Sequence, residues 1–279
     1  MQPRSTMPFI LSLALALAVG FVPARAAAGP DDPVVPKELA HVGVNEHLDG
    51  QVPLDLNFRD HTGKPVRLGQ YVDGRRPVVL TFAYHTCPVV CSMILNNVAT
   101  SLSGVGWTVG KDYDVVTISF DPKETLEKTA AKRASILAQY KRPEAEGGWH
   151  FLVGDEANIK RATDSVGYEF TYDAEQQQYG HPAVIMILKP NGRVSRYLYG
   201  LEHNPTDLKM SLLEASEGKS ISTVDKMVLY CYRYDPKDGK YVVVATRVMQ
   251  VGGGATALLL ASFLSVLWIR ERGKKEKSE

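Results

Sequence analysis

Two cysteines separated by three residues mark the part of the chain that is best prepared for chemistry. Cys87 and Cys91 follow a β-favouring run at residues 78–84 and open a helical pattern, with Pro88 suited to the first helical position. Side chains four residues apart lie on one side of a helix. Free backbone N–H groups and the positive end of the helix dipole favour thiolates there. The pair is therefore prepared either to bind a soft metal or to attack a disulfide.

The spacing of the pair leaves both tasks open. Cβ atoms four residues apart on a helix are about 5–6 Å apart, whereas a disulfide requires about 3.5–4.5 Å. The pair is therefore less suited to rapid disulfide cycling than C-x-x-C, but it can hold one metal ion between two sulfurs. A redox pair in an oxidising compartment is one alternative. A stabilising disulfide is another, although so short a loop gains little from the entropy of closure.

Hydrophobic patterning predicts the elements that position these thiols. Alternation at residues 54–58 and a return at 66–68 predict a hairpin around a turn at 61–64. Further strands are predicted at residues 78–84, 115–120, 149–153, 184–188 and 194–198, and helices from Pro88 and at residues 125–140, 156–166 and 208–217. Strands that alternate with helices and end in a hairpin predict an α/β fold, with a mixed central sheet and helices on both faces.

One distant histidine could complete a metal site. His181 lies just before Pro182 and the predicted strand at residues 184–188. In a thioredoxin-like sheet, the loop that enters this strand packs against the start of the thiol-bearing helix and often holds a cis proline. The imidazole would then reach both sulfurs. Two thiolates and one imidazole form a soft site of low coordination number, suited to Cu(I) and able to take Cu(II). The alternative is a solvated loop histidine.

At these positions the chain resembles the Sco/SenC family, copper-binding proteins that assemble cytochrome c oxidase. The resemblance covers about residues 45–215. It rests on Cys87-Pro88-Val89-Val90-Cys91, on Ser119-Phe120-Asp121-Pro122, and on His181 with the apolar strand and Asn191-Gly192 after it. The resemblance implies a thioredoxin-like fold, and it implies that Cys87, Cys91 and His181 bind copper. The implied role is that of a metallochaperone, which delivers copper to the binuclear site of oxidase subunit II or reduces its thiols. Another copper-accepting membrane protein could take the place of subunit II.

Two enzymatic alternatives use the same thiols. A thiol–disulfide oxidoreductase would use Cys87 and Cys91 as catalytic redox residues and would not need His181, and a thiol peroxidase is a further option. His85 is expected to be a loop histidine beside the site rather than an outer ligand. Cys231 could be a spare ligand, a mixed-disulfide partner or an inert thiol.

Apolar segments at both ends predict where the protein lies. Residues 1–28 have the features of a secretory signal peptide, with an uncleaved anchor helix as the alternative. Residues 248–269 carry no charge and, at about 1.5 Å per residue, would be roughly 33 Å long, enough to cross a bilayer. The basic residues of 270–279 predict a cytoplasmic tail. We therefore expect a single-pass protein of a bacterial inner membrane, with its folded domain in the periplasm.

Composition supports one folded domain between these ends. The chain is 44% hydrophobic and 23% charged, as expected for a globular domain. Its 32 Lys and Arg balance 31 Asp and Glu, which argues against binding to nucleic acid. The expected organisation is a flexible lead-in at residues 29–44, a thioredoxin-like domain at 45–220 and a juxtamembrane extension at 221–247.

Overall fold

The fold is that of a computed structural model that describes residues 42–86, 90–175, 177–216, 232–235, 240–243 and 245–275. The predicted signal peptide, residues 29–41 of the predicted lead-in, Cys87 and Cys231 lie outside the described residues. Of Cys91, the description covers its place in a helix.

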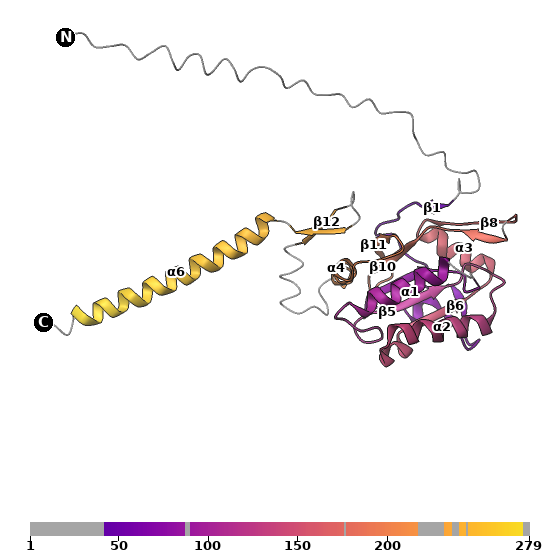
Figure 1. The fold of residues 1–279 in the computed structure, drawn as a ribbon, viewed down its shortest axis with the longest axis horizontal. Coiled ribbons are helices and arrows are strands. Elements are labelled where there is room, and N and C mark those ends of the chain that lie inside the picture. The colour runs from indigo at the N-terminus through magenta and orange to yellow at the C-terminus, as the bar shows by residue number, and fades with distance from the viewer. Residues whose placement is uncertain are drawn as a thin grey trace, which may run out of the picture. The chain divides into compact units, whose positions relative to one another are not determined.

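Seven strands form one mixed sheet in the order β11-β10-β4-β5-β6-β2-β3 (Figure 1). β4, β5 and β6 are parallel, whereas β10 runs antiparallel to both β4 and β11. Every residue of β4, β5 and β10 is buried, so both faces of the centre of the sheet are covered. The strands are β2 (Asn57–Asp60), β3 (Pro65–Arg67), β4 (Val78–Phe82), β5 (Asp114–Ile118), β6 (Trp149–Val153), β10 (Val184–Leu188) and β11 (Val194–Tyr199).

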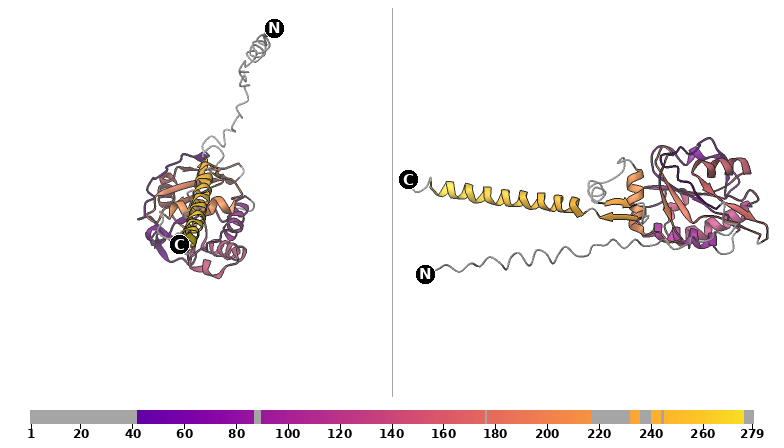
Figure 2. Two further views of the ribbon diagram at one scale, coloured as in Figure 1. Left: turned by 90° about the vertical axis from the view of Figure 1, so that its left-hand side faces the viewer. Right: turned by 90° about the horizontal axis from the view of Figure 1, so that it is seen from above.

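Four helices cover this sheet: α1 (Val90–Ser103), α2 (Leu126–Tyr140), α3 (Glu156–Ser165) and α4 (Pro205–Ala215) (Figures 1 and 2). α1 contacts both α2 and α4. The unit β4–α1–β5, followed later in the chain by β10, β11 and α4, gives the predicted thioredoxin-like fold with helices on both faces of a mixed sheet. Thr125, Asp155 and Asn204 begin three of these helices, because each side chain accepts a hydrogen bond from a backbone N–H of the first turn.

Two small antiparallel ribbons differ from the sequence-based expectation. β8 (Thr171–Asp173) pairs with β9 (Gln178–Gly180), and β1 (Gly43–Val44) pairs with β7 (Tyr168–Glu169). The last residues of the segment expected to be a flexible lead-in are therefore paired. The strands are short and largely polar, so they lack the alternation by which a half-buried strand is found. β9 leads directly into His181, which means that this missed hairpin sets the position of the histidine loop.

The predicted juxtamembrane extension contains a further hairpin of β12 (Tyr232–Asp235) and β13 (Lys240–Val243). The backbone N–H of Tyr241 donates to Asp207 Oδ1 of α4 at 2.9 Å, and its hydroxyl donates to Glu214 of the same helix. Arg196 of β11 also pairs with Glu214, at 2.6 Å. The hairpin is therefore tied to the folded domain by polar contacts.

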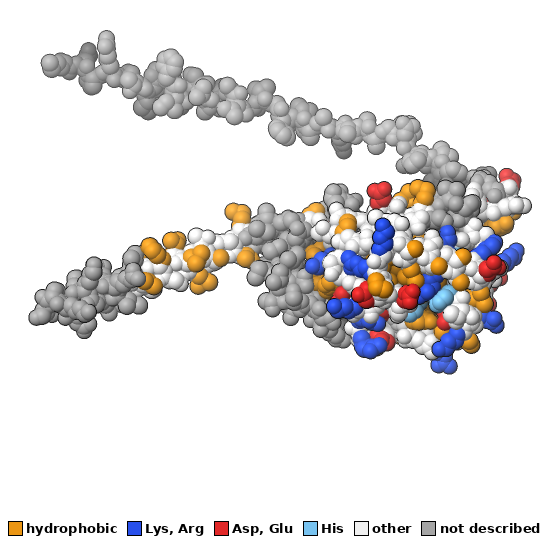
Figure 3. Space-filling model, turned by 60° about the horizontal axis from the view of Figure 1, so that its bottom comes forward, with side chains coloured by type: hydrophobic (Ala, Val, Ile, Leu, Met, Phe, Trp, Pro, Cys, Tyr) orange, Lys and Arg blue, Asp and Glu red, His pale blue; other side chains and the backbone are white. Residues whose placement is uncertain are grey.

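Helix α6 (Ala245–Lys275) follows this hairpin. Its stretch Met249–Val266 is unburied and, by length and composition, suited to cross a membrane; among the described residues it is the one helix of this kind. Hydrophobic side chains are exposed along the described part of α6 (Figure 3). The helix extends beyond the predicted span of residues 248–269 at both ends. The first residues of the predicted basic tail, 270–275, are helical.

Burial holds three histidines of the domain in the neutral form. Burial lowers the pKa of His85 from its usual 6.5 to about 3, and it lowers the pKa of His150 and of His203 to about 4. An unfolded histidine takes up a proton near its usual pKa. Between these values the unfolded state therefore binds more protons than the folded state, and the free energy of unfolding falls as the pH falls.

We predict that acid destabilises the copper-free chain in this window. Between about pH 7.5 and about pH 5, a buried histidine with a pKa of about 4, such as His203, contributes a loss of about 2 kcal/mol. Urea unfolding at the two pH values measures this loss. His203→Gln should reduce the difference by that amount, whereas a pH dependence identical to that of the wild type would contradict the assignment to this buried imidazole.

Candidate metal centre

The strand predicted before Cys87 and the helix predicted after it are both present. β4 ends at Phe82, α1 begins at Val90, and Cys91 is the second residue of the helix. Cys91 therefore lies in the first turn, where backbone N–H groups have no acceptor within the helix. Cys87 precedes Val90 by three positions in the sequence and lies outside the described residues.

A carboxylate from the loop after β5 fixes the two residues that precede Cys87. Glu124 Oε2 accepts hydrogen bonds from the backbone N–H groups of His85 at 2.6 Å and Thr86 at 3.2 Å. Its Oε1 accepts the hydroxyl of Thr86 at 2.7 Å. Charge-assisted hydrogen bonds of this kind are short and strong. The structure thus identifies Glu124 as a positioning residue for residues 83–86, which lead from β4 to Cys87 and are called the cysteine loop below.

Replacement of Glu124 by alanine should loosen this loop, because it removes three acceptor contacts at once. Loss of such bonds costs about 1–3 kcal/mol, so we expect a comparable fall in the free energy of unfolding and faster amide hydrogen exchange at His85 and Thr86. Glu124→Gln should have a smaller effect, since its amide oxygen still accepts. Glu202→Ala, in the loop between β11 and α4, is the control; exchange in Glu124→Ala as slow as in this control would contradict the assignment.

His181 is half-buried in an aromatic setting and does not extend into open solvent. Its ring centroid lies 5.2 Å from that of Phe120 and 6.3 Å from that of Tyr84, whose ring is perpendicular to it. Its Nδ1 lies 3.2 Å from the hydroxyl oxygen of Tyr168 and 3.2 Å from the carbonyl oxygen of Pro182. All peptide bonds of the described residues are trans, that of Pro182 included.

The same surroundings determine the protonation of the His181 imidazole. Burial lowers the pKa of His181 below its usual value, although the Pro182 carbonyl opposes this shift. The ring is therefore neutral at neutral pH, the form that binds metals. A carbonyl oxygen can only accept, so Nδ1 donates to Pro182 in the tautomer that carries its lone pair on Nε2; the Tyr168 hydroxyl lies at the same distance from Nδ1.

Tyr84 connects the cysteine loop to the histidine loop. It follows β4 three residues before Cys87, and its ring contacts His181, Phe120 and Tyr179. The structure therefore brings the loop of His181 against the segment that leads to Cys87. Among the described residues, which include neither Cys87 nor the thiol of Cys91, no group of three potential metal ligands is found.

His85 turns away from this centre and into the core. It is 4% exposed, its Nδ1 lies 3.0 Å from Thr129 Oγ1 on α2, and its ring packs against Phe151 of β6. These contacts give it a structural role and do not support the alternative of an outer ligand. The role of Cys231 stays a prediction.

Sequence reasoning missed the residues that surround His181 and the cysteine loop. Phe120 and Tyr84 follow the parallel strands β5 and β4, and carboxyl ends of parallel strands meet at one edge of a sheet, so their proximity could have been inferred. Tyr168 and Tyr179 belong to the short ribbons that have no recognisable period. Glu124 lies two residues after the quoted Asp121-Pro122 segment, but its partners depend on how the two loops fold.

The chain is similar to one protein family and to solved structures of known proteins. The family model described as SCO1/SenC matches residues 48–215. Among solved structures, a putative electron transfer protein from Aquifex aeolicus VF5 is 24% identical, covers 62% of this chain and 96% of its own, and superposes with a TM-score of 0.54, which shows a shared fold. ScoI from Arabidopsis thaliana with copper bound is 19% identical, with coverage of 58% and 96% and a TM-score of 0.47. ScoI from Bradyrhizobium japonicum with copper bound is 22% identical, with coverage of 61% and 98% and a TM-score of 0.42. None of the curated proteins compared with the chain matches it.

Proposed function

The chain belongs to the SCO1/SenC family, and from this premise we propose that it is a copper carrier for the assembly of cytochrome c oxidase. BsSco, one of its structural neighbours, is a member of the Sco family of cytochrome c oxidase assembly proteins, and the two ScoI neighbours bind copper. The proposed recipient is subunit II of the oxidase or another copper-accepting membrane protein.

The proposed ligands are the thiolates of Cys87 and Cys91 and Nε2 of His181. The observation that carries this assignment is the contact between the rings of His181 and Tyr84, because it joins the histidine loop to the segment that leads to Cys87. Sulfur and imidazole ligands suit copper, in the Cu(I) or the Cu(II) state. Copper is the cargo here, and a site with few ligands can release it by ligand exchange.

The surrounding residues support this role in three ways. The position of Cys91 in the first turn of α1 favours its thiolate. Glu124 holds the residues before Cys87 in place. The rings around His181 keep its imidazole neutral and oriented before metal arrives.

We propose further that α6 anchors the protein in the bacterial inner membrane, with the folded domain in the periplasm and the end of the chain in the cytoplasm. Its apolar stretch Met249–Val266 supports this placement, as do the basic residues that follow. We propose also that residues 1–28 are a signal peptide, which would direct the folded domain to the periplasm. An anchor that holds the copper carrier in the same membrane as its recipient raises the effective concentration of the two proteins for each other, which favours a transient encounter.

A copper-transfer experiment tests the proposed function. The full chain in detergent, loaded with Cu(I) and freed of excess metal, is mixed with the copper-free soluble domain of oxidase subunit II, and the copper content of both is measured after separation. The proposal predicts that copper moves to the recipient. Copper that stays with the chain while free Cu(I) loads the recipient would contradict it.

Thiol–disulfide exchange is a second candidate, favoured by the helix-start position of Cys91. The pair would reduce a disulfide of the target by two electrons and become a disulfide itself, so a further thiol reductant would have to restore it. Cys91→Ser should then trap a mixed disulfide through Cys87 with the oxidised recipient. No trapped species, under conditions where the wild type transfers copper, would exclude this candidate.

A further inference from the structure

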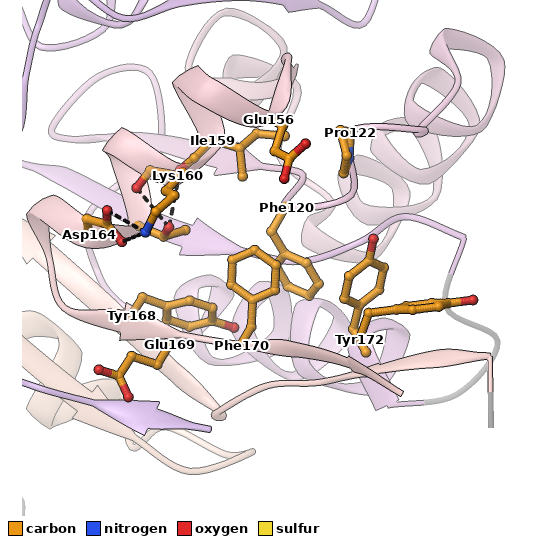
Figure 4. Close-up of a pocket in the computed structure, with 12 residues that line it drawn as sticks. Phe120, Pro122, Glu156, Ile159, Lys160, Asp164, Tyr168, Glu169, Phe170 and Tyr172 are labelled. Carbon is orange, nitrogen blue, oxygen red and sulfur yellow. Dashed lines mark hydrogen bonds and ion pairs between the residues drawn. The ribbon is translucent and has the colours of Figure 1, made fainter. Parts of the chain in front are cut away.

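An aromatic cavity lies beside the proposed copper site. It has a volume of about 520 Å³ and lies between α3, the loop after β5 and the strands β7 to β9 (Figure 4). Five rings form its walls: Phe120, Tyr168, Phe170, Tyr172 and Tyr179. Phe120 and Tyr168 also contact His181, and Tyr179 lies two residues before it. One set of rings therefore borders both the cavity and the proposed ligand.

The charges around the cavity are mainly negative. Lys160 is paired with Asp164 at 2.8 Å, which neutralises the one cation of the lining. Two exposed carboxylates remain, Glu156 and Glu169, and they lie on opposite sides of the aromatic rings (Figure 4). Within the described part of the chain, neither has an ion-pair partner. The cavity thus offers ring faces between two carboxylates, an arrangement that suits a cationic side chain.

A second cavity continues the first toward the cysteine loop. It has a volume of about 190 Å³ and shares Tyr172 and Tyr179 with the first cavity. It also includes Thr86, the residue before Cys87, and Asp121, whose carboxylate accepts a hydrogen bond from the Tyr179 hydroxyl at 3.3 Å. Tyr172 and Tyr179 are thus a common wall of the two cavities, which together extend from α3 past the β8–β9 hairpin to Thr86 and are called the groove below.

We propose that this groove receives an extended segment of the protein partner, and that the aromatic cavity binds an arginine side chain of that segment. A guanidinium can stack on a ring face and pair with a carboxylate at the same time. The groove would then bring the following part of the segment to Thr86, so that the metal-accepting or thiol residues of the partner lie next to Cys87. This inference deepens the proposed function and rests on it, since a carrier must recognise its recipient.

Two short peptides test the arginine assignment. The full chain in non-ionic detergent is mixed with acetyl-Gly-Arg-Gly-amide or with the same peptide containing citrulline, which is neutral and nearly isosteric, and saturation-transfer NMR measures binding to each. We expect saturation of the arginine side-chain protons and an affinity about fivefold or more above that of the citrulline peptide. Equal affinities would overturn the proposal. A lysine peptide that binds as well as the arginine peptide would overturn the choice of a guanidinium.

Variants locate the binding in the cavity. Glu156→Gln combined with Glu169→Gln should reduce arginine binding to the citrulline level. Tyr172→Leu, at a residue 53% exposed, should weaken it about two- to fivefold. Glu202→Gln removes a carboxylate that does not line the cavity, and it should change nothing. Arginine binding that survives the double substitution would overturn the proposed site.

Copper content measured on the same samples separates this inference from the function on which it rests. The double variant should bind as much copper as the wild type, because neither glutamate is a proposed ligand. If the wild type has normal copper content but shows no preference for arginine, the proposed arginine site in the groove is wrong and the proposed copper-carrier function still stands. Arginine preference without copper binding in the wild type would contradict the carrier.

Discussion

Replacing Cys91 with serine is expected to abolish copper binding by the full chain. A serine hydroxyl is protonated at neutral pH and is a hard oxygen donor, so it does not replace a thiolate toward a soft metal. Loss of one such ligand should cost about 3 kcal/mol or more, at least about a hundredfold in affinity. Anaerobic loading with Cu(I) against a competing chelator, followed by measurement of copper per chain, gives this affinity. Cys87→Ser should give the same result.

Cys231→Ser is the matched control, because it removes the third thiol of the chain and leaves the proposed site intact. It should retain the copper affinity of the wild type. A Cys91→Ser variant that binds copper as tightly as the wild type would contradict the ligand assignment, and loss of copper in Cys231→Ser would add a ligand to it.

His181→Ala is expected to weaken copper binding about ten- to a hundredfold and to change the absorption spectrum of the complex. The effect is smaller than that of a cysteine substitution, since an imidazole is neutral and the two sulfurs remain. Competition with the chelator measures the affinity, and urea unfolding shows whether the folded domain is retained after loss of the Tyr168 and Pro182 contacts.

His61→Ala serves as the control for this prediction. His61 lies in the turn between β2 and β3 and has no role in the proposed site, so its substitution should leave affinity and spectrum unchanged. An unchanged spectrum and affinity in His181→Ala would mean that the imidazole does not bind copper.

The central strands could be predicted from the sequence because they are continuous buried runs. The run predicted at residues 78–84 is β4 (Val78–Phe82), and that at 184–188 is β10 (Val184–Leu188). Such strands have few alternatives, since both faces need apolar side chains. The order of these elements then indicates the sheet topology. The expected thioredoxin-like fold placed the His181 loop against the start of the thiol-bearing helix, and the structure shows His181 against Tyr84, three residues before Cys87.

Other features depend on contacts that no local pattern records. Glu124 has the appearance of an ordinary loop acid, and it becomes a positioning residue only because the loop after β5 meets the end of β4. In the β8–β9 hairpin, Tyr179 packs against Tyr172 of the partner strand and also against Tyr84 and Phe120 from elsewhere in the domain. The β12–β13 hairpin, in contrast, had a usable signal: tyrosines that alternate with charged residues at 232–235 and an apolar run at 241–244 flank Pro, Asp and Gly at residues 236–239.

The ends of α6 show a related limit of sequence reasoning. Hydropathy predicts the apolar span but not where the helix begins and ends. Arg, Glu and Lys at residues 270–275 are good helix formers, so the helix continues beyond the uncharged stretch.

X-ray absorption at the copper edge tests the ligand set most directly, with the copper-loaded wild type measured beside His181→Ala. The account predicts two sulfur ligands and one imidazole in the wild type, and loss of the imidazole scattering in the variant while both sulfurs remain. Identical spectra from the two proteins, at equal copper content, would show that the histidine loop takes no part in holding the metal.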